Sequence, residues 1–189
     1  MEKAIQNIIK ESIKTKELLY KRQIESIEKA AKAIIISLKA GGKVLIFGNG
    51  GSAADSQHIV AELVGRFKKE RPALPAIALS TNTSILSAIA NDYGYEITFS
   101  RQLEALAKSK DVAIALSTSG NSKNVLEALK KAKALGLVTI GLTGQNGGLL
   151  KEVCDISILV PSKETARIQE SHIMIGHIIC ELVEREMFR

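Results

Sequence analysis

The sequence predicts an α/β fold, a three-layer sandwich in which helices flank a five-stranded parallel sheet. Short β-rich runs alternate with helical stretches, the runs are apolar on both faces, and polar loops follow two of them. The expected strands span residues 43–47, 76–80, 111–116, 138–143 and 155–160. Strands that are apolar on both faces need helices on both sides, so ligands are expected at their carboxyl ends.

Helical stretches are expected at both ends of the chain. Residues 4–40 carry apolar side chains at the three-to-four spacing of amphipathic helices, and Gly41-Gly42 ends that segment. A final helix is expected over about residues 164–188. No linker divides the chain, so residues 1–189 are interpreted as a single domain. Because segment 1–40 offers more apolar surface than such a core requires, we expect it to form an oligomer interface.

Composition and charge exclude several classes of protein. No apolar run approaches the ~20 residues that span a bilayer, and the N-terminus lacks a signal-peptide core, so a cytoplasmic protein without membrane contact is expected. The net charge is +6, but the 26 Lys and Arg residues are scattered. A solvated surface is therefore favoured over a nucleic-acid patch. Cys154 and Cys180 form no C-x-x-C pair and are expected to be buried apolar residues.

A glycine-rich loop, Gly48-Asn49-Gly50-Gly51-Ser52, connects the first expected strand to an amphipathic stretch. Backbone N–H groups at such a helix start bind anions. The loop also fits the dinucleotide fingerprint G-x-G-x-x-A, but the second strand ends without the acidic residue that binds ribose. No G-K-S or G-K-T follows either. A nicotinamide cofactor and a P-loop are thus disfavoured, and a glycine turn without a ligand stays an alternative.

A second polar loop, Ser117-Thr118-Ser119-Gly120-Asn121-Ser122, follows the third expected strand. A helix cap alone is the simpler interpretation, since Ser, Thr and Asn are favoured N-caps. One cap needs only one residue, whereas several hydroxyls around a glycine suit the oxygens of one phosphate. The two loops together predict a phosphorylated small-molecule ligand.

Two pairs of polar residues lie on the helices beside these loops. His58 and Glu62 are four residues apart on one helix face, where they can either ligate a metal or form a surface pair. Gln169 and His177 are ~12 Å apart along the last helix, which strains a single shared site. Either the long side chains converge, or a neighbouring subunit supplies one of them. His172 is an alternative site residue on this helix, although a surface position is favoured for it.

Several motifs closely resemble those of sugar isomerase (SIS) domain proteins of the phosphoheptose isomerase family. They are G-N-G-G-S, A-A-D-S-Q-H-I-V-A-E, A-N-D-Y-G-Y, S-T-S-G-N-S, T-G-Q-N-G-G and A-R-I-Q-E-S-H, and they span nearly the whole chain. The resemblance implies a flavodoxin-like, Rossmann-like SIS fold and a homotetramer. It also implies isomerisation of sedoheptulose 7-phosphate to D-glycero-D-manno-heptose 7-phosphate, toward the ADP- or GDP-heptose of lipopolysaccharide or related surface glycans.

The resemblance also assigns site residues. It places the sugar phosphate on Asn49, Gly50, Gly51, Ser52, Glu62, Asn91, Asp92, Ser117, Thr118, Ser119, Ser122 and Gln169. It places zinc on His58, Glu62, Gln169 and His177. Asn91 and Asp92 are expected just after a helix over 83–90, where a loop cap is the alternative. Arg66 either meets phosphate or pairs at the surface.

Aldose–ketose isomerisation needs a base for a carbon-bound proton and an acid for the oxygens. Glu62 and His177 are the catalytic candidates: Glu62 for the carbon-bound proton, through a cis-enediol, and His177 either for the oxygens or for the opposite proton transfer, an order that the sequence does not reveal. Zinc would polarise the carbonyl. The alternative is a catalytically silent SIS-domain regulator that binds a sugar phosphate or a replication-initiation protein. That regulator lacks equivalents of Glu62 and His177, so their presence favours an enzyme.

Overall fold

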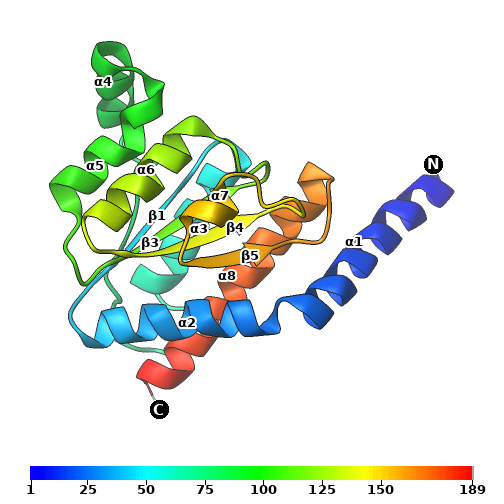
Figure 1. Cartoon of the computed structure of the whole chain (residues 1–189). Coiled ribbons are helices and arrows are strands. Elements are labelled where there is room, and N and C mark those ends of the chain that lie inside the picture. The colour runs from blue at the N-terminus through cyan, green and yellow to red at the C-terminus, as the bar shows by residue number, and fades with distance from the viewer. Residues whose placement is uncertain (189) are drawn as a thin grey trace.

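A five-stranded parallel sheet lies between two layers of helices in the computed structural model, which describes residues 1–188 (Figure 1). The strands are β1 (Val44–Gly48), β2 (Ala76–Ala78), β3 (Val112–Ser117), β4 (Val138–Thr143) and β5 (Ile156–Leu159). Their order is β2-β1-β3-β4-β5, and every neighbouring pair is parallel. The expected fold class and all five expected strands are confirmed, with ends that differ by at most two residues.

Eight α-helices and one 3₁₀ helix surround the sheet within residues 1–188. They are α1 (Glu2–Arg22), α2 (Ile24–Lys39), α3 (Gly51–Val64), α4 (Thr83–Tyr93), η1 (Tyr95–Ile97), α5 (Thr98–Leu106), α6 (Lys123–Ala134), α7 (Leu150–Val153) and α8 (Thr165–Met187). The expected helical segment 4–40 and the final helix are confirmed. The expected end of the fourth helix at Ala90 is wrong, because α4 continues to Tyr93 and stops at Gly94, whose φ is 97°.

The apolar core forms two clusters, one on each face of the sheet, because successive side chains of a strand point to opposite faces. In β1, Val44 and Ile46 belong to the cluster that contains residues of α2, α3 and α8. Leu45 and Phe47 belong to the second cluster, with residues of α5, α6 and α7. All four side chains are fully buried, which is worth roughly 1.5–3 kcal/mol for each large apolar residue. Helices on both faces therefore explain why the strands read as continuous apolar runs.

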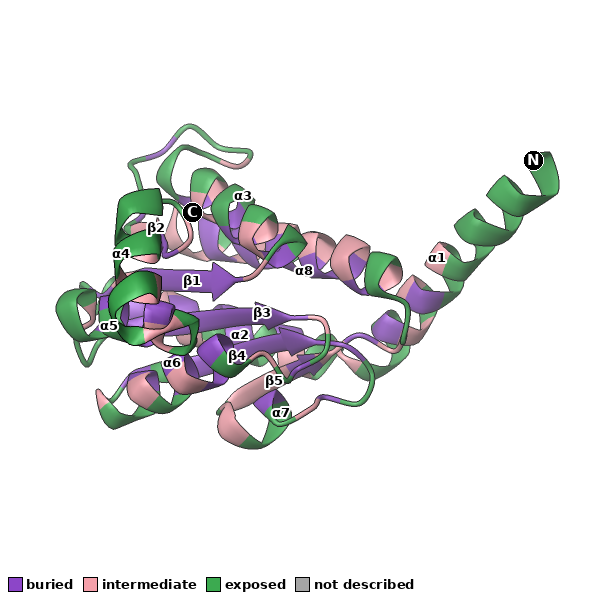
Figure 2. Cartoon of the chain, turned by 90° about the horizontal axis from the view of Figure 1, so that it is seen from above, coloured by how far each residue is buried: buried purple, intermediate pink, exposed green. Residues whose placement is uncertain are grey.

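Helix α1 extends away from the rest of the chain (Figures 1 and 2). Only Thr15 and Leu19 are buried in it, while Ile5, Ile8, Ile9 and Ile13 are each about half exposed. A helix with an exposed apolar stripe of this kind typically packs against another protein surface. No helix within the described residues is long and apolar enough to cross a membrane.

The direction of strand winding reverses between β1 and β3. These strands are neighbours, with Gly48 opposite Leu116, although they are first and third in the chain. In open α/β sheets, ligands bind in the crevice at such a switch point, outside the carboxyl ends of the strands. The glycine loop (residues 48–52) follows β1 and the serine loop (residues 117–122) follows β3, so the topology brings both loops to this crevice.

Candidate active site

The glycine loop opens directly into α3. Gly50 is the N-cap residue; its φ of 56° favours glycine, and no side chain caps the helix. Gly51 is confined by Gln169 of α8, because a Cβ on Gly51 would lie 2.3 Å from Nε2 of Gln169. The start of α3 therefore lacks a side-chain cap and lies next to the Gln169 amide, while the N–H groups of Ser52 and Ala53 donate to the carbonyls of Asn49 and Gly50, each at 3.0 Å. This arrangement suits the anionic or hydroxyl oxygens of a ligand.

The serine loop is ordered by its own hydroxyl groups. The Oγ atoms of Ser117 and Ser122 lie 3.1 Å apart, and the backbone N–H of Gly120 donates to Ser117 Oγ at 3.2 Å. Ser122 occupies the N-cap position of α6 but makes no capping hydrogen bond with its side chain. A helix cap alone therefore does not account for these hydroxyls. The N-terminus of α6, like that of α3, lacks a side-chain cap at the crevice.

A pair of asparagines joins the two loops. Asn49 Nδ2 donates to Asn124 Oδ1 at 2.8 Å, and Asn124 Nδ2 donates back to Asn49 Oδ1 at 2.9 Å. The hydroxyl of Tyr95 donates to the same Asn49 oxygen at 3.0 Å. Asn124 is buried, and its two bonds with Asn49 are partly buried, whereas the Tyr95 bond is exposed. They hold the glycine loop against α6 and fix the spacing of the two anion-binding loops.

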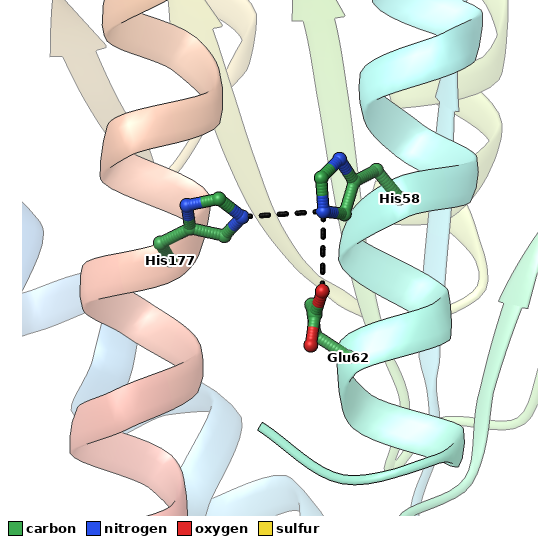
Figure 3. A group of neighbouring side chains, drawn as sticks. All are labelled: His58, Glu62 and His177. Atoms are coloured by element: carbon green, nitrogen blue, oxygen red, sulfur yellow. Dashed lines mark hydrogen bonds and ion pairs between the residues drawn. The ribbon is translucent and has the colours of Figure 1, made fainter. Parts of the chain in front are cut away.

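Three titratable side chains meet further along α3 (Figure 3). His58 Nε2 lies 3.1 Å from Glu62 Oε1 and 3.4 Å from His177 Nε2 of α8. One potential ligand atom from each of the three residues lies within 4.8 Å of the other two. Helices α3 and α8 come this close because residue 176 is glycine: a Cβ there would lie 2.6 Å from Ile59 side-chain carbons. His58 and Glu62 thus belong to a cluster between two helices.

The donor set of this cluster fits a zinc ion. Nε2 of His58 carries at most one hydrogen, yet it faces both Glu62 Oε1 and His177 Nε2. A cation that accepts a lone pair from each of the three atoms would satisfy them together. Imidazole nitrogen and carboxylate oxygen are the ligands that zinc uses alongside thiolate.

The chain is similar over its whole length to proteins of one family. The SIS domain model matches residues 8–144. Phosphoheptose isomerase from Clostridium acetobutylicum is 53% identical over 190 residues, which cover 100% of this chain and 97% of the relative. The Aquifex aeolicus phosphoheptose isomerase is 56% identical over 180 residues, covering 95% and 94%. The chain belongs to the phosphoheptose isomerase family of SIS domain proteins.

Two solved structures of phosphoheptose isomerases have the same fold as this chain. The phosphoheptose isomerase GmhA from Neisseria gonorrhoeae superposes with a TM-score of 0.93 at 41% identity, covering 97% of this chain and 98% of the other. A family member from Francisella tularensis superposes with a TM-score of 0.94 at 38% identity and 97% coverage of each chain. The family and fold that the motifs indicate are confirmed.

The other residues assigned by family resemblance lie at different places. Gln169 contacts Gly51 at the glycine loop, about 10 Å along α3 from His58 at the usual helical rise. Its role as a zinc ligand stays a prediction. Asn91 and Asp92 are exposed in the last turn of α4 and not, as expected, in a loop after it. There Asn91 Nδ2 donates to Asp92 Oδ1 at 2.8 Å.

Two expectations about single residues resolve clearly. His172 is fully buried rather than at the surface, because it lies on the face of α8 that carries Ile168 and Ile175 into the core. Burial lowers the pKa of His172 to about 4. Arg66 Nε lies 3.6 Å from Glu70 Oε2 in an exposed ion pair. This agrees with the interpretation that Arg66 pairs at the surface.

The cysteines behave as apolar residues. Cys180 is buried in the core and Cys154 is half-buried. Burial raises the pKa of each thiol to about 12, so neither supplies a thiolate near neutral pH. The expectation that they are not catalytic thiols is in keeping with this.

Several residues at the site were not found from the sequence. Tyr95 and Asn124 hold Asn49, and the ring of Phe67 lies against His177 with centroids 5.5 Å apart. Asp55 lies on α3 between Gly51 and His58, and burial raises the pKa of its carboxyl although His58 opposes the shift. Asp55 and Tyr95 carried a sequence signal, since each stands within a motif shared with the family.

Proposed function

We propose that this protein isomerises sedoheptulose 7-phosphate to D-glycero-D-manno-heptose 7-phosphate. One observation carries the proposal: Glu62, on the helix that begins at the glycine loop, meets His177 of α8 in a single cluster. A regulator that only binds a sugar phosphate needs the loops but has no use for a carboxylate clustered with two imidazoles. Relatives of similar length that are more than half identical are named for this isomerisation.

The two loops are proposed to bind the end of the sugar that does not react. Hydroxyl groups of the serine loop and N–H groups at the start of α6 would hold the phosphate. The glycine loop and Gln169 would bind sugar hydroxyls, and Asn91 and Asp92 would contribute from α4. The phosphate-binding residues are Ser117, Thr118, Ser119 and Ser122. Binding energy from the phosphate then orients the distant C1 and C2 atoms.

Glu62 and His177 are proposed to move the protons. The Glu62 carboxylate removes a proton from C1, and the electrons of that bond form the C1–C2 double bond while His177 delivers a proton to O2. The resulting cis-enediol loses its O1 proton to His177, and Glu62 returns the carbon-bound proton to C2. Each group ends the cycle in its starting state, as an acid–base catalyst must.

A zinc ion is proposed at the same cluster. His58, Glu62 and His177 would hold it, with Gln169 as the fourth ligand that family resemblance suggests. When bound, zinc supplies a Lewis acid that polarises the carbonyl and stabilises negative charge on the sugar oxygens. The Glu62 carboxylate is a weaker base while it ligates a cation, so its two roles compete.

A homotetramer in the cytoplasm is proposed as the working form. The exposed isoleucines of α1 support an assembly, because an apolar stripe of this length is unfavourable in water. A site between subunits would also give Asn91 and Asp92 access to a sugar bound by a neighbour. The product would feed ADP- or GDP-heptose synthesis for lipopolysaccharide or another surface glycan.

The activity is tested by NMR of sedoheptulose 7-phosphate with purified, zinc-supplied protein in deuterated buffer. The proposal predicts enzyme-dependent aldose signals and deuterium at the carbon that receives a proton. Absence of aldose with folded, oligomeric, zinc-supplied protein would overturn it. Aldose without deuterium would retain the isomerase but exclude proton exchange with solvent during the enediol step.

A further inference from the structure

A buried ion pair, Arg71 and Glu184, lies near the cluster of His58, Glu62 and His177. Arg71 Nε is 3.2 Å from Glu184 Oε2, and the two side chains are only 2% and 3% exposed. Glu184 stands two helical turns after His177 on α8, and Arg71 lies in the loop that follows α3. The pair therefore connects the segments that carry Glu62 and His177.

The Glu184 carboxylate binds three consecutive backbone N–H groups of that loop. Phe67 donates at 3.1 Å, Lys68 at 2.9 Å and Lys69 at 2.7 Å. Burial alone would raise the pKa of Glu184, but these three bonds and Arg71 outweigh it and hold the pKa below its usual value. The carboxylate is therefore charged at neutral pH and fixes the loop backbone residue by residue.

Arg71 in turn caps the end of α3. Its guanidinium donates to the carbonyl of Glu62 at 2.8 Å and to the carbonyl of Leu63 at 2.7 Å. A cation that satisfies the last carbonyls of a helix stabilises its final turn. The final turn of α3 is the one that carries the Glu62 side chain, so Arg71 holds the backbone of the proposed base.

Phe67 extends the same loop to His177. The rings of Phe67 and His177 have centroids 5.5 Å apart at an interplanar angle of 32°. The ring of His58 lies on the imidazole from another direction, with centroids 5.0 Å apart at 69°. The imidazole of His177 is thus confined by Phe67, whose own backbone N–H is bound by Glu184.

We propose that Arg71 and Glu184 are positioning residues for the isomerisation: they fix residues 65–71, so that Phe67 orients His177 and the end of α3 orients Glu62. The proposal rests on the proposed function for the roles of Glu62 and His177. All the residues that the proposal involves belong to this chain, and it requires no additional ligand. The effect falls on the reacting atoms, because the serine loop lies at the other end of the site.

A second buried ion pair in the same protein provides the matched control. Asp111 Oδ2 lies 2.5 Å from Lys43 Nζ. The Asp111 carboxylate also accepts hydrogen bonds from the backbone N–H groups of Lys43, at 2.9 Å, and Lys108, at 2.8 Å. It precedes β3, at the amino-terminal edge of the sheet, opposite the crevice. Asp111→Asn therefore removes a similar charge and similar hydrogen bonds without touching the site.

The test compares steady-state kinetics and melting temperature for Glu184→Gln, Phe67→Leu and Asp111→Asn. We expect Glu184→Gln and Phe67→Leu to lower kcat roughly 10–100-fold and to change KM less than about threefold. Asp111→Asn is expected to lower the melting temperature while kcat stays at the wild-type value. Unchanged kcat in Phe67→Leu, or equal kcat losses in Glu184→Gln and Asp111→Asn, would overturn the proposal.

The double variant Phe67→Leu/Glu184→Gln tests whether both act through one route. If Glu184 acts through Phe67, the kcat loss of the double variant is close to the larger single loss. A loss equal to the product of the two single losses contradicts that route. If Glu184→Gln does not fold, Phe67→Leu alone still decides the proposal, because it leaves the ion pair intact.

A readout without turnover separates this proposal from the proposed function. The chain has three histidines, so the ring protons of His177 can be assigned in NMR spectra of the metal-free protein by substitution. We expect Glu184→Gln to shift the His177 ring signals, because displacement of the Phe67 ring changes its ring-current effect on them. Asp111→Asn should leave these signals unchanged. Unmoved signals in Glu184→Gln overturn the positioning role even if the wild type proves inactive on the heptulose.

Discussion

The two ends of α3 differ in what they offer a ligand. At its start, the helix has no side-chain cap and adjoins the glycine loop, which the Asn49–Asn124 bridge holds against α6. At its end, Arg71 covers the last carbonyls, and the chemistry is left to side chains: His58, Glu62 and, from α8, His177. One helix thus adjoins the proposed ligand-binding loops at its start and carries the clustered titratable side chains toward its end.

The comparison explains why the site needs so few specialised residues. A helix start attracts phosphate by its partial positive charge, whatever its side chains. Proton transfer instead needs particular groups held at fixed positions, and the structure surrounds them with contacts. We therefore propose that the two loops determine binding and that side-chain packing around Glu62 and His177 determines reactivity. The following predictions separate the two ends.

The largest effect is expected at the reacting end. Glu62→Gln keeps the size of the side chain but removes the base, so kcat should fall by about 10²–10⁴-fold. The aldose formed by NMR gives the rate directly. Gln57→Glu, on an exposed turn of the same helix, is the matched control and should retain activity. A Glu62→Gln rate within tenfold of the wild type would remove Glu62 from the mechanism.

Metal binding sharpens the assignment of the same end. His58→Ala removes one of three converging donors, so zinc affinity should fall by more than the roughly 10–100-fold that changes outside the ligand shell cause. Metal content after dialysis at a fixed free zinc concentration measures it. His172→Phe, which alters a buried histidine outside the cluster, should retain zinc. Equal zinc loss in both variants would mean that the three side chains are not the binding site.

The binding end should respond to charge. Ser119→Asp places a carboxylate on the exposed part of the serine loop, where it repels phosphate, so KM should rise roughly 10–100-fold with a smaller change in kcat. Ser109→Asp, an exposed serine at the opposite edge of the sheet, controls for the added charge. A wild-type KM in Ser119→Asp would place the phosphate elsewhere.

The smallest effect on catalysis is expected from His172. Its pKa is about 4 in the folded chain and 6.5 when solvated, so the unfolded state takes up a proton first as pH falls. Stability from the neutral imidazole is complete above pH 6.5 and is lost as pH falls toward 4, on the order of 3 kcal/mol. Urea unfolding at pH 7 and pH 5 should show a smaller drop for His172→Phe than for wild type. An identical drop would contradict this.

The sequence predicted features that depend on local pattern. Strand runs such as 112–116 and the two loops that follow strands were readable because apolar periodicity and glycine placement act over a few residues. The pair His58 and Glu62 was also found, since four-residue spacing on a helix fixes a shared face. The convergence of His177 with this pair was inferred only through family resemblance.

Contacts between distant segments were not readable in this way. The Asn49–Asn124 bridge joins residues 75 positions apart, and the Arg71–Glu184 pair joins residues 113 apart. Neither follows from spacing along one element. His172 was misplaced at the surface because a histidine in a polar motif gives no sign that its helix face is turned inward. The end of α4 was missed because Asn and Asp are typical of loops, although Gly94 ends this helix.

The central claim is that phosphate binding at the serine loop and reaction at the cluster near the end of α3 can be separated. Isothermal titration calorimetry with sedoheptulose 7-phosphate tests it on Glu62→Gln and Ser119→Asp side by side. The account predicts that Glu62→Gln binds within about threefold of the wild-type affinity while it fails to turn over, and that Ser119→Asp loses affinity by about 10–100-fold. Loss of binding in Glu62→Gln, equal to that in Ser119→Asp, would contradict it.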